Sequence, residues 1–388
     1  MSFRGVDYYA TDELLTDEER LIRDTFRRFV DDELMPIVAG HFRAGTFPRE
    51  LPARLGELGA LGASLQGYGC AGLGPVAYGL IMQELERCDS GFRSFASVQG
   101  SLVMYPIHSY GTEEQKQRWL PAMAAGRAIG CFGLTEPDFG SNPSGMRTTA
   151  TRTNTGWVLN GEKRWITSGG LADVAVVWAR TSEGEIRGFL VERGTKGFAT
   201  HDIEGKFSLR ASVTSELIFE DCHLPESAIL PGSGGLKSPL SCLNQARYGI
   251  SWGAVGAAMA CYEEALSYTK ERVQFRRPIA GYQLVQAKLV GMLEDITNSQ
   301  LLAWRLGRLK EAGRARPQQV SLAKRHNVRV ALEAARTARD LLGANGVTDE
   351  YQAGRHMCNL ESVFTYEGTD HIHTLILGQD ITGINAFE

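Results

Sequence analysis

Residues 131–145 read CFGLTEPDFGSNPSG and mark the point where the character of the chain changes. Before this stretch the sequence has helical periodicity, and after it short strand-like runs follow one another. Its Gly, Ser, Thr and Pro residues are typical of a loop that exposes backbone N–H groups and hydroxyls, which suit an anionic or polar-ring ligand. A plain turn would have the same composition, so other segments must decide between the two readings.

The part before this loop, residues 1–130, is predicted to be a helical domain. Residues 16–19 read TDEE, a capping-box pattern that starts a helix. Apolar residues follow at spacings of three to four until Pro36, which should end or kink that helix. Residues 76–85 and 113–123 continue the helical pattern.

Residues 131–240 are predicted to form a small β-barrel-like domain. A hairpin is expected between residues 157–159 and 163–167, because Asn160-Gly161 between them is a type I′ turn signal. Further short strands are expected at residues 174–178, 188–192 and 216–220.

Residues 241–388 are predicted to form a four-helix bundle. Three long segments without internal proline lie at residues 243–274, 283–312 and 317–343, and a shorter helix should follow near the end. Long helices joined by short connections favour antiparallel packing. The predicted fold class is therefore α+β and mainly α: a helical domain, a β-barrel-like domain and a four-helix bundle.

Composition excludes several classes of protein. The chain has 388 residues, 43% of them hydrophobic, and a net charge of -4. General nucleic-acid binding is not expected, because it needs a basic surplus. No membrane span is expected either, since the longest uncharged stretch, residues 58–83, contains Pro75 and many glycines. The N-terminus lacks the apolar segment of an export signal, so a cytoplasmic location is expected. The seven scattered Cys residues favour reduced thiols.

Two tempting motifs carry little information. Residues 67–72 spell G-x-G-x-x-G, but no strand precedes them, so a plain glycine loop is favoured over a dinucleotide site. In Asp370-His371-Ile372-His373 the two histidines would face different sides of a helix. A capping or hydrogen-bonding role is therefore favoured, and no metal site is expected.

Three other segments are stronger candidates for a functional site, because all three have residues suited to ligand binding or catalysis. Trp165-Ile166-Thr167 places an aromatic plane beside a hydroxyl at the end of a strand. Residues 272–278, RVQFRRP, end a long helix in a cluster of arginines, and residues 270–279 hold four cations less Glu271, or +3. Residues 366–369, YEGT, put a carboxylate between an aromatic residue and a glycine. A carboxylate among apolar neighbours has a raised pKa and can act as a general base. Each segment also has a structural explanation when taken singly. Trp165 could be a packed aromatic residue, residues 272–278 a solvated helix end, and Glu367 an N-cap.

Taken together, these residues resemble the acyl-CoA dehydrogenase family, and the resemblance covers almost the whole chain. TEPDFGSNPSG is similar to the family's flavin and thioester loop, WIT to its strand beside the isoalloxazine, R-x-Q-F to its pyrophosphate contact, and LLGANG to the bundle turn that completes that contact. The subgroup it resembles most is the glutaryl-CoA dehydrogenases. The similar segments are DSGFRSFASVQGSLVM, KFSLRASVTSE, CLNQARYGISWG, NLESVFTYEGT and ILGQDITG.

The resemblance implies FAD as cofactor and an acyl-CoA as substrate. Glu367 would remove the α-proton while the β-hydrogen leaves as hydride to the flavin, and the backbone N–H of this base would help to polarise the thioester carbonyl. FAD contacts are expected from two subunits, so an oligomer, expected to be a homotetramer, is required. The implied FAD residues are Phe132, Leu134, Thr135, Gly140, Ser141, Trp165, Ile166, Thr167, Arg272, Phe275, Gln283, Asp340, Gly343, Ala344, Thr369 and Asp370.

Arg93 is the residue that would set the substrate class. A cation at the blind end of an acyl pocket selects a distal carboxylate, as in glutaryl-CoA, although Arg93 could instead pair with Asp89. Glu86 and Tyr366 match positions that surround the reacting centre in decarboxylating members, so crotonyl-CoA and CO2 are the implied products. The remaining implied substrate contacts are Ser94, Ser97, Ser141, Leu243, Asn244, Arg247, Gly368 and Phe387.

Two departures from the family pattern leave alternatives open. Arg276 replaces the usual Gly after R-x-Q-F, and Asp370-His371 reverses a common His-Asp order. The substrate could therefore be a related dicarboxyl thioester, on CoA or on a carrier protein, that is not decarboxylated. A flavin oxidase or monooxygenase and a non-enzymatic scaffold on this fold also remain open. In the favoured interpretation, electrons pass to an electron-transfer flavoprotein.

Overall fold

The computed structural model describes residues 5–387. Its first part is helical, as predicted, and the capping box at Thr16 starts the first long helix as expected. The helices of this part are α1 (Asp17–Phe29), α2 (Met35–Ala44), α3 (Leu51–Glu57), α4 (Pro75–Cys88), α5 (Ser90–Ser97), α6 (Tyr105–Tyr110) and α7 (Glu113–Ala124).

Pro36 marks the start of α2, and a π-helical segment, Val30–Leu34, joins α2 to α1. Proline has no backbone N–H, so the regular α-helical hydrogen bonding cannot continue through it. The chain changes its hydrogen-bonding pattern here and stays helical. The predicted G-x-G-x-x-G loop lies between α3 and α4, with positive φ at all three glycines. Residues 5–66 contain no strand before it, which agrees with a plain glycine loop.

The middle part is a seven-stranded sheet. Its strands are β1 (Gly130–Gly133), β2 (Thr149–Thr153), β3 (Gly156–Thr167), β4 (Val174–Thr181), β5 (Ile186–Glu192), β6 (Phe198–Asp202) and β7 (Thr214–Pro225). The order is β1-β4-β2-β3-β7-β6, with β5 also paired to β4. β4 runs parallel to β1 and β2, and the other pairs are antiparallel.

The predicted hairpin at Asn160-Gly161 is wrong, because both flanking runs belong to the single strand β3. The pair forms an irregularity in the β3–β7 register instead of a turn. The Asn160 side chain bonds across to Asp221, accepting from its backbone N–H at 2.8 Å. Gly161 has a φ of 141°, and a Cβ there would lie 2.7 Å from Cα of Thr148. The glycine serves a close backbone approach, which sequence alone does not distinguish from a turn.

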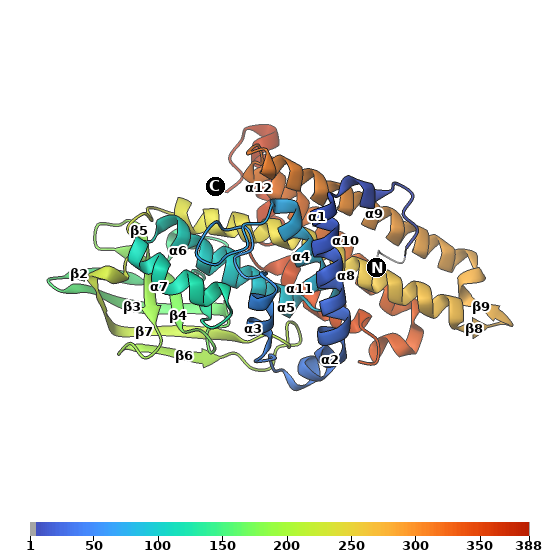
Figure 1. Cartoon of the computed structure of the whole chain (residues 1–388), viewed down its shortest axis with the longest axis horizontal. Helices are drawn as coiled ribbons and strands as arrows, with labels where there is room; N and C mark the ends of the chain where they lie inside the picture. The colour runs from blue at the N-terminus through green and yellow to red at the C-terminus, as the bar shows by residue number, and fades with distance from the viewer. Residues whose placement is uncertain (1–4, 388) are drawn as a thin grey trace.

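The last part is helical: α8 (Lys237–Glu271), α9 (Gln283–Glu311), α10 (Pro317–Leu341), α11 (Ala353–Thr365) and α12 (Asp370–Thr382). Two shorter helices follow the three long ones, where one was expected. The short strands β8 (Val273–Gln274) and β9 (Arg277–Pro278) connect α8 to α9. Figure 1 shows the sheet at one end of the molecule and β8–β9 at the other, with α8 running between them.

Helix α8 joins the helical parts into one core. It packs against α4 and α10, and its central residues, Tyr248–Tyr262, are buried. All seven cysteines have free thiols, as the scattered spacing predicted. Within residues 5–387, no helix combines the length and apolarity that crossing a membrane would require.

Gly256 sets the distance between α8 and α4. A Cβ at this position would lie 1.9 Å from the backbone carbonyl oxygen of Gln83. We expect Gly256→Ala to lower the free energy of unfolding by about 1–3 kcal/mol, because backbone atoms must move apart. Gly40→Ala in exposed α2 is the matched control; it meets nothing within 4 Å and should stabilise by about 0.5–1 kcal/mol. Urea unfolding of both variants checks this, and an unchanged stability in Gly256→Ala would contradict the close packing.

Candidate active site

Glu367 lies in the short loop between α11 and α12. Its φ is 52°, and Gly368 after it has a φ of 90°. A left-handed conformation costs a non-glycine residue about 1–2 kcal/mol, so the surrounding structure must hold it. Thr369 caps α12 by accepting from the backbone N–H of Ile372. The sequence prediction of a carboxylate between two helices is confirmed.

Two cations, the buried Lys324 and the partly buried Arg247, hold the carbonyl oxygens of this loop. Arg247 of α8 donates from Nε to the carbonyl of Glu367 at 2.6 Å. Lys324 of α10 donates from Nζ to the carbonyls of Tyr366 at 3.2 Å and Gly368 at 2.9 Å. The sequence analysis placed Arg247 near the substrate but missed Lys324. The sequence pattern that could have found Lys324 is its position on the apolar face of the helix: Val320 lies four residues before it and Val328 four residues after it.

The Glu367 carboxyl group has the environment of a base. Its Oε2 atom is buried and has no hydrogen-bond partner in the described part of the chain, although the residue as a whole is partly exposed. Burial raises the pKa of Glu367 above its ordinary value, and the charges of Arg93, Arg247 and Lys324 oppose that rise. An unpaired carboxylate with a raised pKa is suited to accept a proton from a bound molecule.

Arg93 of α5 and Glu86 of α4 form a fully buried ion pair. Both side chains are 0% exposed, and Arg93 Nε lies 2.6 Å from Glu86 Oε2. Nη2 of Arg93 donates to the hydroxyl of Tyr366, while Nη1 has no partner among residues 5–387. Burial opposes the charge of Arg93, but Glu86 and other neighbours raise its pKa above the ordinary value. Glu86, Arg93, Tyr366 and Glu367 are thus brought together as predicted.

The alternative pairing of Arg93 with Asp89 does not occur. Asp89 accepts from the backbone N–H of Gly91 at 2.7 Å and from Asn359 at 2.8 Å, and it forms an ion pair with Arg355 at 3.2 Å. Asp89 therefore ties α5 to α11. The open donor of Arg93 remains available to a ligand.

The other predicted substrate residues fall into three places. Ser94 and Ser97 are buried on α5 with Arg93. Leu243 and Asn244 lie at one end of α8 before Arg247, and Oδ1 of Asn244 is buried without a partner within the described residues. Phe387 lies beyond α12 and is 51% exposed. The structure gives Phe387 no contact that joins it to Glu367.

The loop that opens the sheet lies beside the end of β3. Phe132 and Leu134 are buried, and the carbonyl of Thr135 accepts from the backbone N–H of Arg164 at 2.8 Å. Glu136 fixes the loop by accepting from the backbone N–H groups of Arg147 at 2.6 Å and Thr148 at 2.9 Å. Farther along this loop, the two residues predicted to meet flavin or substrate are exposed: Gly140 and Ser141.

Trp165 is the most unusual residue near this loop. It lies at a register shift in the β3–β7 pair, with a φ of 63° and 56% of its surface exposed. A bulky residue in the left-handed region is strained, and such strain concentrates at ligand sites. Ile166 is buried behind it, and Thr167 ends the strand, as predicted. The exposed indole beside an open glycine-bearing loop fits a planar ring.

The remaining predicted cofactor residues lie far from the sheet. Arg272, Phe275 and Gln283 are exposed on and beside β8–β9, at the opposite end of the molecule in Figure 1. Asp340, Gly343 and Ala344 are exposed where α10 ends. Asp340 pairs with Lys288 of α9, so both sets lie at this end of the molecule. In one copy of the chain they lie away from Trp165 and the sheet, so a site that used residues from both ends would need two copies.

The Asp370-His371-Ile372-His373 motif has a structural role in α12. Asp370 is buried and pairs with Arg329 at 2.5 Å and Arg325 at 3.4 Å. His373 is buried and His371 is exposed, so the two rings face different sides, as predicted. Residues 5–387 contain no group of three potential metal-ligating side chains.

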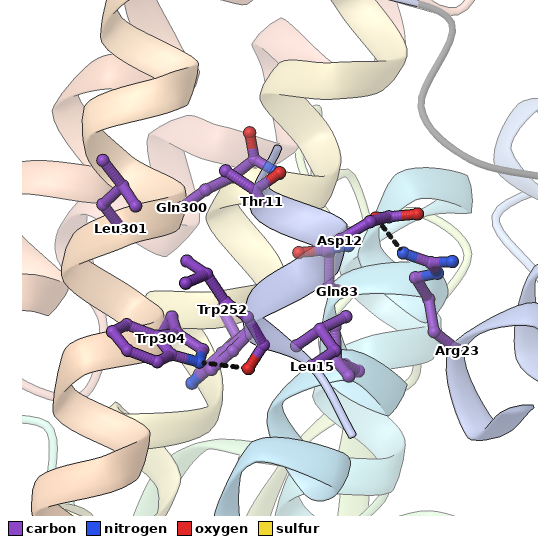
Figure 2. Close-up of a pocket in the computed structure, with 11 residues that line it drawn as sticks. Thr11, Asp12, Leu15, Arg23, Gln83, Trp252, Gln300, Leu301 and Trp304 are labelled. Atoms are coloured by element: carbon purple, nitrogen blue, oxygen red, sulfur yellow. Dashed lines mark hydrogen bonds and ion pairs between the residues drawn. The ribbon is translucent and has the colours of Figure 1, made fainter. Parts of the chain in front are cut away.

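A separate cavity of about 40 Å³ lies among α1, α4, α8 and α9. Figure 2 shows Trp252, Trp304 and Leu15 around it, with the ion pair of Arg23 and Asp12 at one side. Its lining includes neither Glu367 nor Arg93, and its volume suits a few water molecules. It is not the site described above.

Sequence models of the three acyl-CoA dehydrogenase domains match the chain in order: N-terminal at residues 16–127, middle at 131–222 and C-terminal at 233–382. A solved glutaryl-CoA dehydrogenase from Mycobacterium smegmatis, in complex with FADH2, is 55% identical over 100% of both chains, with a TM-score of 0.98.

Two further relatives are more distant. The human mitochondrial short-chain specific acyl-CoA dehydrogenase is 34% identical over 94% of this chain and 90% of its own length. A chain in a solved structure of the electron transferring flavoprotein of Acidaminococcus fermentans is 34% identical, covers 97% of this chain and 100% of that chain, and has a TM-score of 0.91. With all three domains matched and a buried, unpaired carboxylate between its last two helices, this chain belongs to the acyl-CoA dehydrogenase family and is an enzyme of that class.

Proposed function

We propose that this enzyme oxidises glutaryl-CoA with FAD and decarboxylates the product to crotonyl-CoA and CO2. The observation that carries the proposal is the buried Arg93 with its unpartnered Nη1. A buried guanidinium with one open donor favours a carboxylate and penalises an acyl chain that ends in a methyl group. Ser94 and Ser97, buried on the same helix, would add hydroxyl contacts. The 55% identity to the Mycobacterium smegmatis glutaryl-CoA dehydrogenase supports the same substrate.

The charge balance of the site supports a dicarboxylic substrate. Arg93, Arg247 and protonated Lys324 supply three positive charges around Glu367, while Glu86 and Glu367 supply two negative ones. With Lys324 protonated, the cluster has one positive charge in excess; burial lowers the pKa of Lys324 to about 7, so this excess is present below that pH. A distal carboxylate on the acyl group would neutralise that charge, whereas a monocarboxylic acyl group would leave it uncompensated in a buried site.

The residues present fit FAD. Trp165, with its exposed ring, and the hydroxyl of Thr167 would lie against the flavin, and the exposed loop at Gly140 and Ser141 would approach it closely. When bound, FAD would accept the hydride that leaves the β-carbon. Arg272, at the end of α8, and Gln283, at the start of α9, would contact FAD from a second copy, together with the turn at residues 340–344. We therefore expect a homo-oligomer, with a tetramer as the family resemblance implies.

The chain's own residues would carry the proton chemistry. Glu367 would take the α-proton, and its backbone N–H would polarise the thioester carbonyl. Loss of the distal carboxylate as CO2 would then leave its electron pair in a dienolate, and protonation of that dienolate would give crotonyl-CoA. Glu86 and Tyr366, both bonded to Arg93, would surround the carboxylate that leaves. We also propose an electron-transfer flavoprotein as acceptor and a cytoplasmic location.

Anaerobic mixing of the FAD-loaded protein with glutaryl-CoA tests the proposal. We expect the flavin absorbance to bleach and the products to be crotonyl-CoA and CO2 in equal amounts. An oxidised flavin after mixing would refute the substrate. Glutaconyl-CoA without CO2 would leave dehydrogenation standing but refute decarboxylation, and would favour the non-decarboxylating alternative. Rapid reoxidation of the reduced protein by air would favour a flavin oxidase.

A further inference from the structure

Lys324 is buried in a way that packing alone does not explain. It is 1% exposed on α10, among buried residues that include Val320, Ala323 and Val328. Taking an ammonium group out of water is costly unless the protein supplies partners. Its two partners are main-chain carbonyls of the loop that carries Glu367, so the lysine serves that loop.

The hydrogen bonds of Lys324 fix the direction of a particular N–H group. Carbonyl oxygen and amide hydrogen point in opposite directions across a planar trans peptide. The carbonyl of Tyr366 shares its peptide with the N–H of Glu367, so a donor at that oxygen orients this N–H. Lys324 also holds the carbonyl of Gly368, and Arg247 holds that of Glu367 between them. Three successive peptides are thus held by two cations.

We propose that Lys324 is a positioning residue for the base, an inference that rests on the proposed function. By holding the carbonyls on either side of Glu367, it maintains the left-handed backbone there. It thereby aims both the carboxylate and the polarising N–H at the substrate. Arg247 alone could not do this, because its bond reaches only the carbonyl of Glu367.

The charge of Lys324 adds a second effect. Burial lowers the pKa of Lys324 to about 7, so the group is cationic at lower pH, and its charge opposes the burial that raises the pKa of Glu367. Removing this charge should therefore raise the pKa of the base further. The other charged or titratable groups near Glu367 or Lys324 are Arg93 of α5, Glu86 and Tyr78 of α4, Arg247 of α8, Tyr366 of the loop, and Asp370 and His373 of α12.

Three variants separate these effects. Lys324→Met removes donor and charge, Lys324→Gln keeps an amide donor without charge, and Lys310→Met is the matched control. Lys310 of α9 is also a lysine whose pKa is lowered by burial, but it is only partly buried and it donates to the side chain of Gln245 at 2.6 Å instead of to the loop of Glu367. We expect Lys324→Met to lower kcat by about 100-fold, as for loss of an oxyanion-hole donor, with little change in KM. Lys310→Met should retain wild-type kcat, and Lys324→Gln should recover part of the loss.

Two measurements distinguish positioning from general stability. The rising limb of the pH profile of kcat should move to higher pH in both Lys324 variants, because the base then needs a higher pH to lose its proton. Amide hydrogen exchange of residues 366–370, measured without substrate, should be faster in Lys324→Met and unchanged in Lys310→Met. Equal kcat losses in both Met variants, an unmoved pH limb, or unchanged exchange in the loop would each overturn the proposal. If none of the acyl-CoA substrates tested reduces the flavin of the wild-type protein, the proposed function fails. The exchange result still decides whether Lys324 holds the loop.

Discussion

Glu367→Gln is expected to keep FAD and lose flavin reduction by glutaryl-CoA. The amide has almost the same shape and cannot accept the α-proton, so we expect a fall of at least about 1,000-fold in the reduction rate, within the range for a lost general base. The buried carboxyl has no hydrogen-bond partner at Oε2 in the described structure, so the change costs the fold little. Stopped-flow absorbance of the flavin, with anaerobic substrate, measures the rate.

The control for this variant is Glu361→Gln. Glu361 lies on α11 in the segment before the loop, and its carboxylate pairs with Arg336 at the surface. The flavin of the Glu361→Gln variant should be reduced by glutaryl-CoA at the wild-type rate. Reduction by Glu367→Gln at a rate close to wild type would show that another group removes the proton, and the assigned base would then be wrong.

The second large effect is expected from Arg93. Arg93→Met removes the buried cation, so kcat/KM for glutaryl-CoA should fall by about 30-fold or more, since losing one partner of a buried charged pair costs about 2–5 kcal/mol. For butyryl-CoA, which has no distal carboxylate, kcat/KM should fall much less, because only the effect of the Arg93 charge on the pKa of Glu367 is then lost. Steady-state kinetics with both substrates gives the ratio.

Stability must be separated from specificity in this experiment. Arg93→Met leaves Glu86 buried without its partner, which is itself destabilising. The double variant Glu86→Gln, Arg93→Met removes both charges and should fold better while keeping the loss toward glutaryl-CoA. If kcat/KM fell equally for both substrates in the double variant, Arg93 would not be the residue that recognises the distal carboxylate.

Much of the fold, and the position of Glu367 in it, could be predicted because the sequence signals for them are local. Thr16 and Glu19 form the capping box that their spacing predicts. The segment from Tyr366 to Thr369 reads as a break between helices, and it is one. Long helical periodicity over the last third of the chain likewise predicted three long helices close to their observed bounds.

The errors and omissions concern contacts between segments distant in sequence. Asn160-Gly161 has the composition of a turn, but pairing with β7 and the approach of Thr148 make it part of a strand. Asp89 is closer in sequence to Arg93 than Glu86 is, yet α5 turns Arg93 toward Glu86. Lys324 gave only a weak signal, since its partners lie more than 40 residues away in sequence.

The sequence by itself determined the helical, strand and helical order of the chain and the presence of Glu367 in a break between helices. Those features depend on periodicity and capping, which act over a few residues. The tertiary structure decided which charges face one another: Arg93 toward Glu86 and Tyr366, and Lys324 and Arg247 toward the loop of the base. The physical reason is that a charge enters a core only where packing supplies its partners, and those partners come from separate helices.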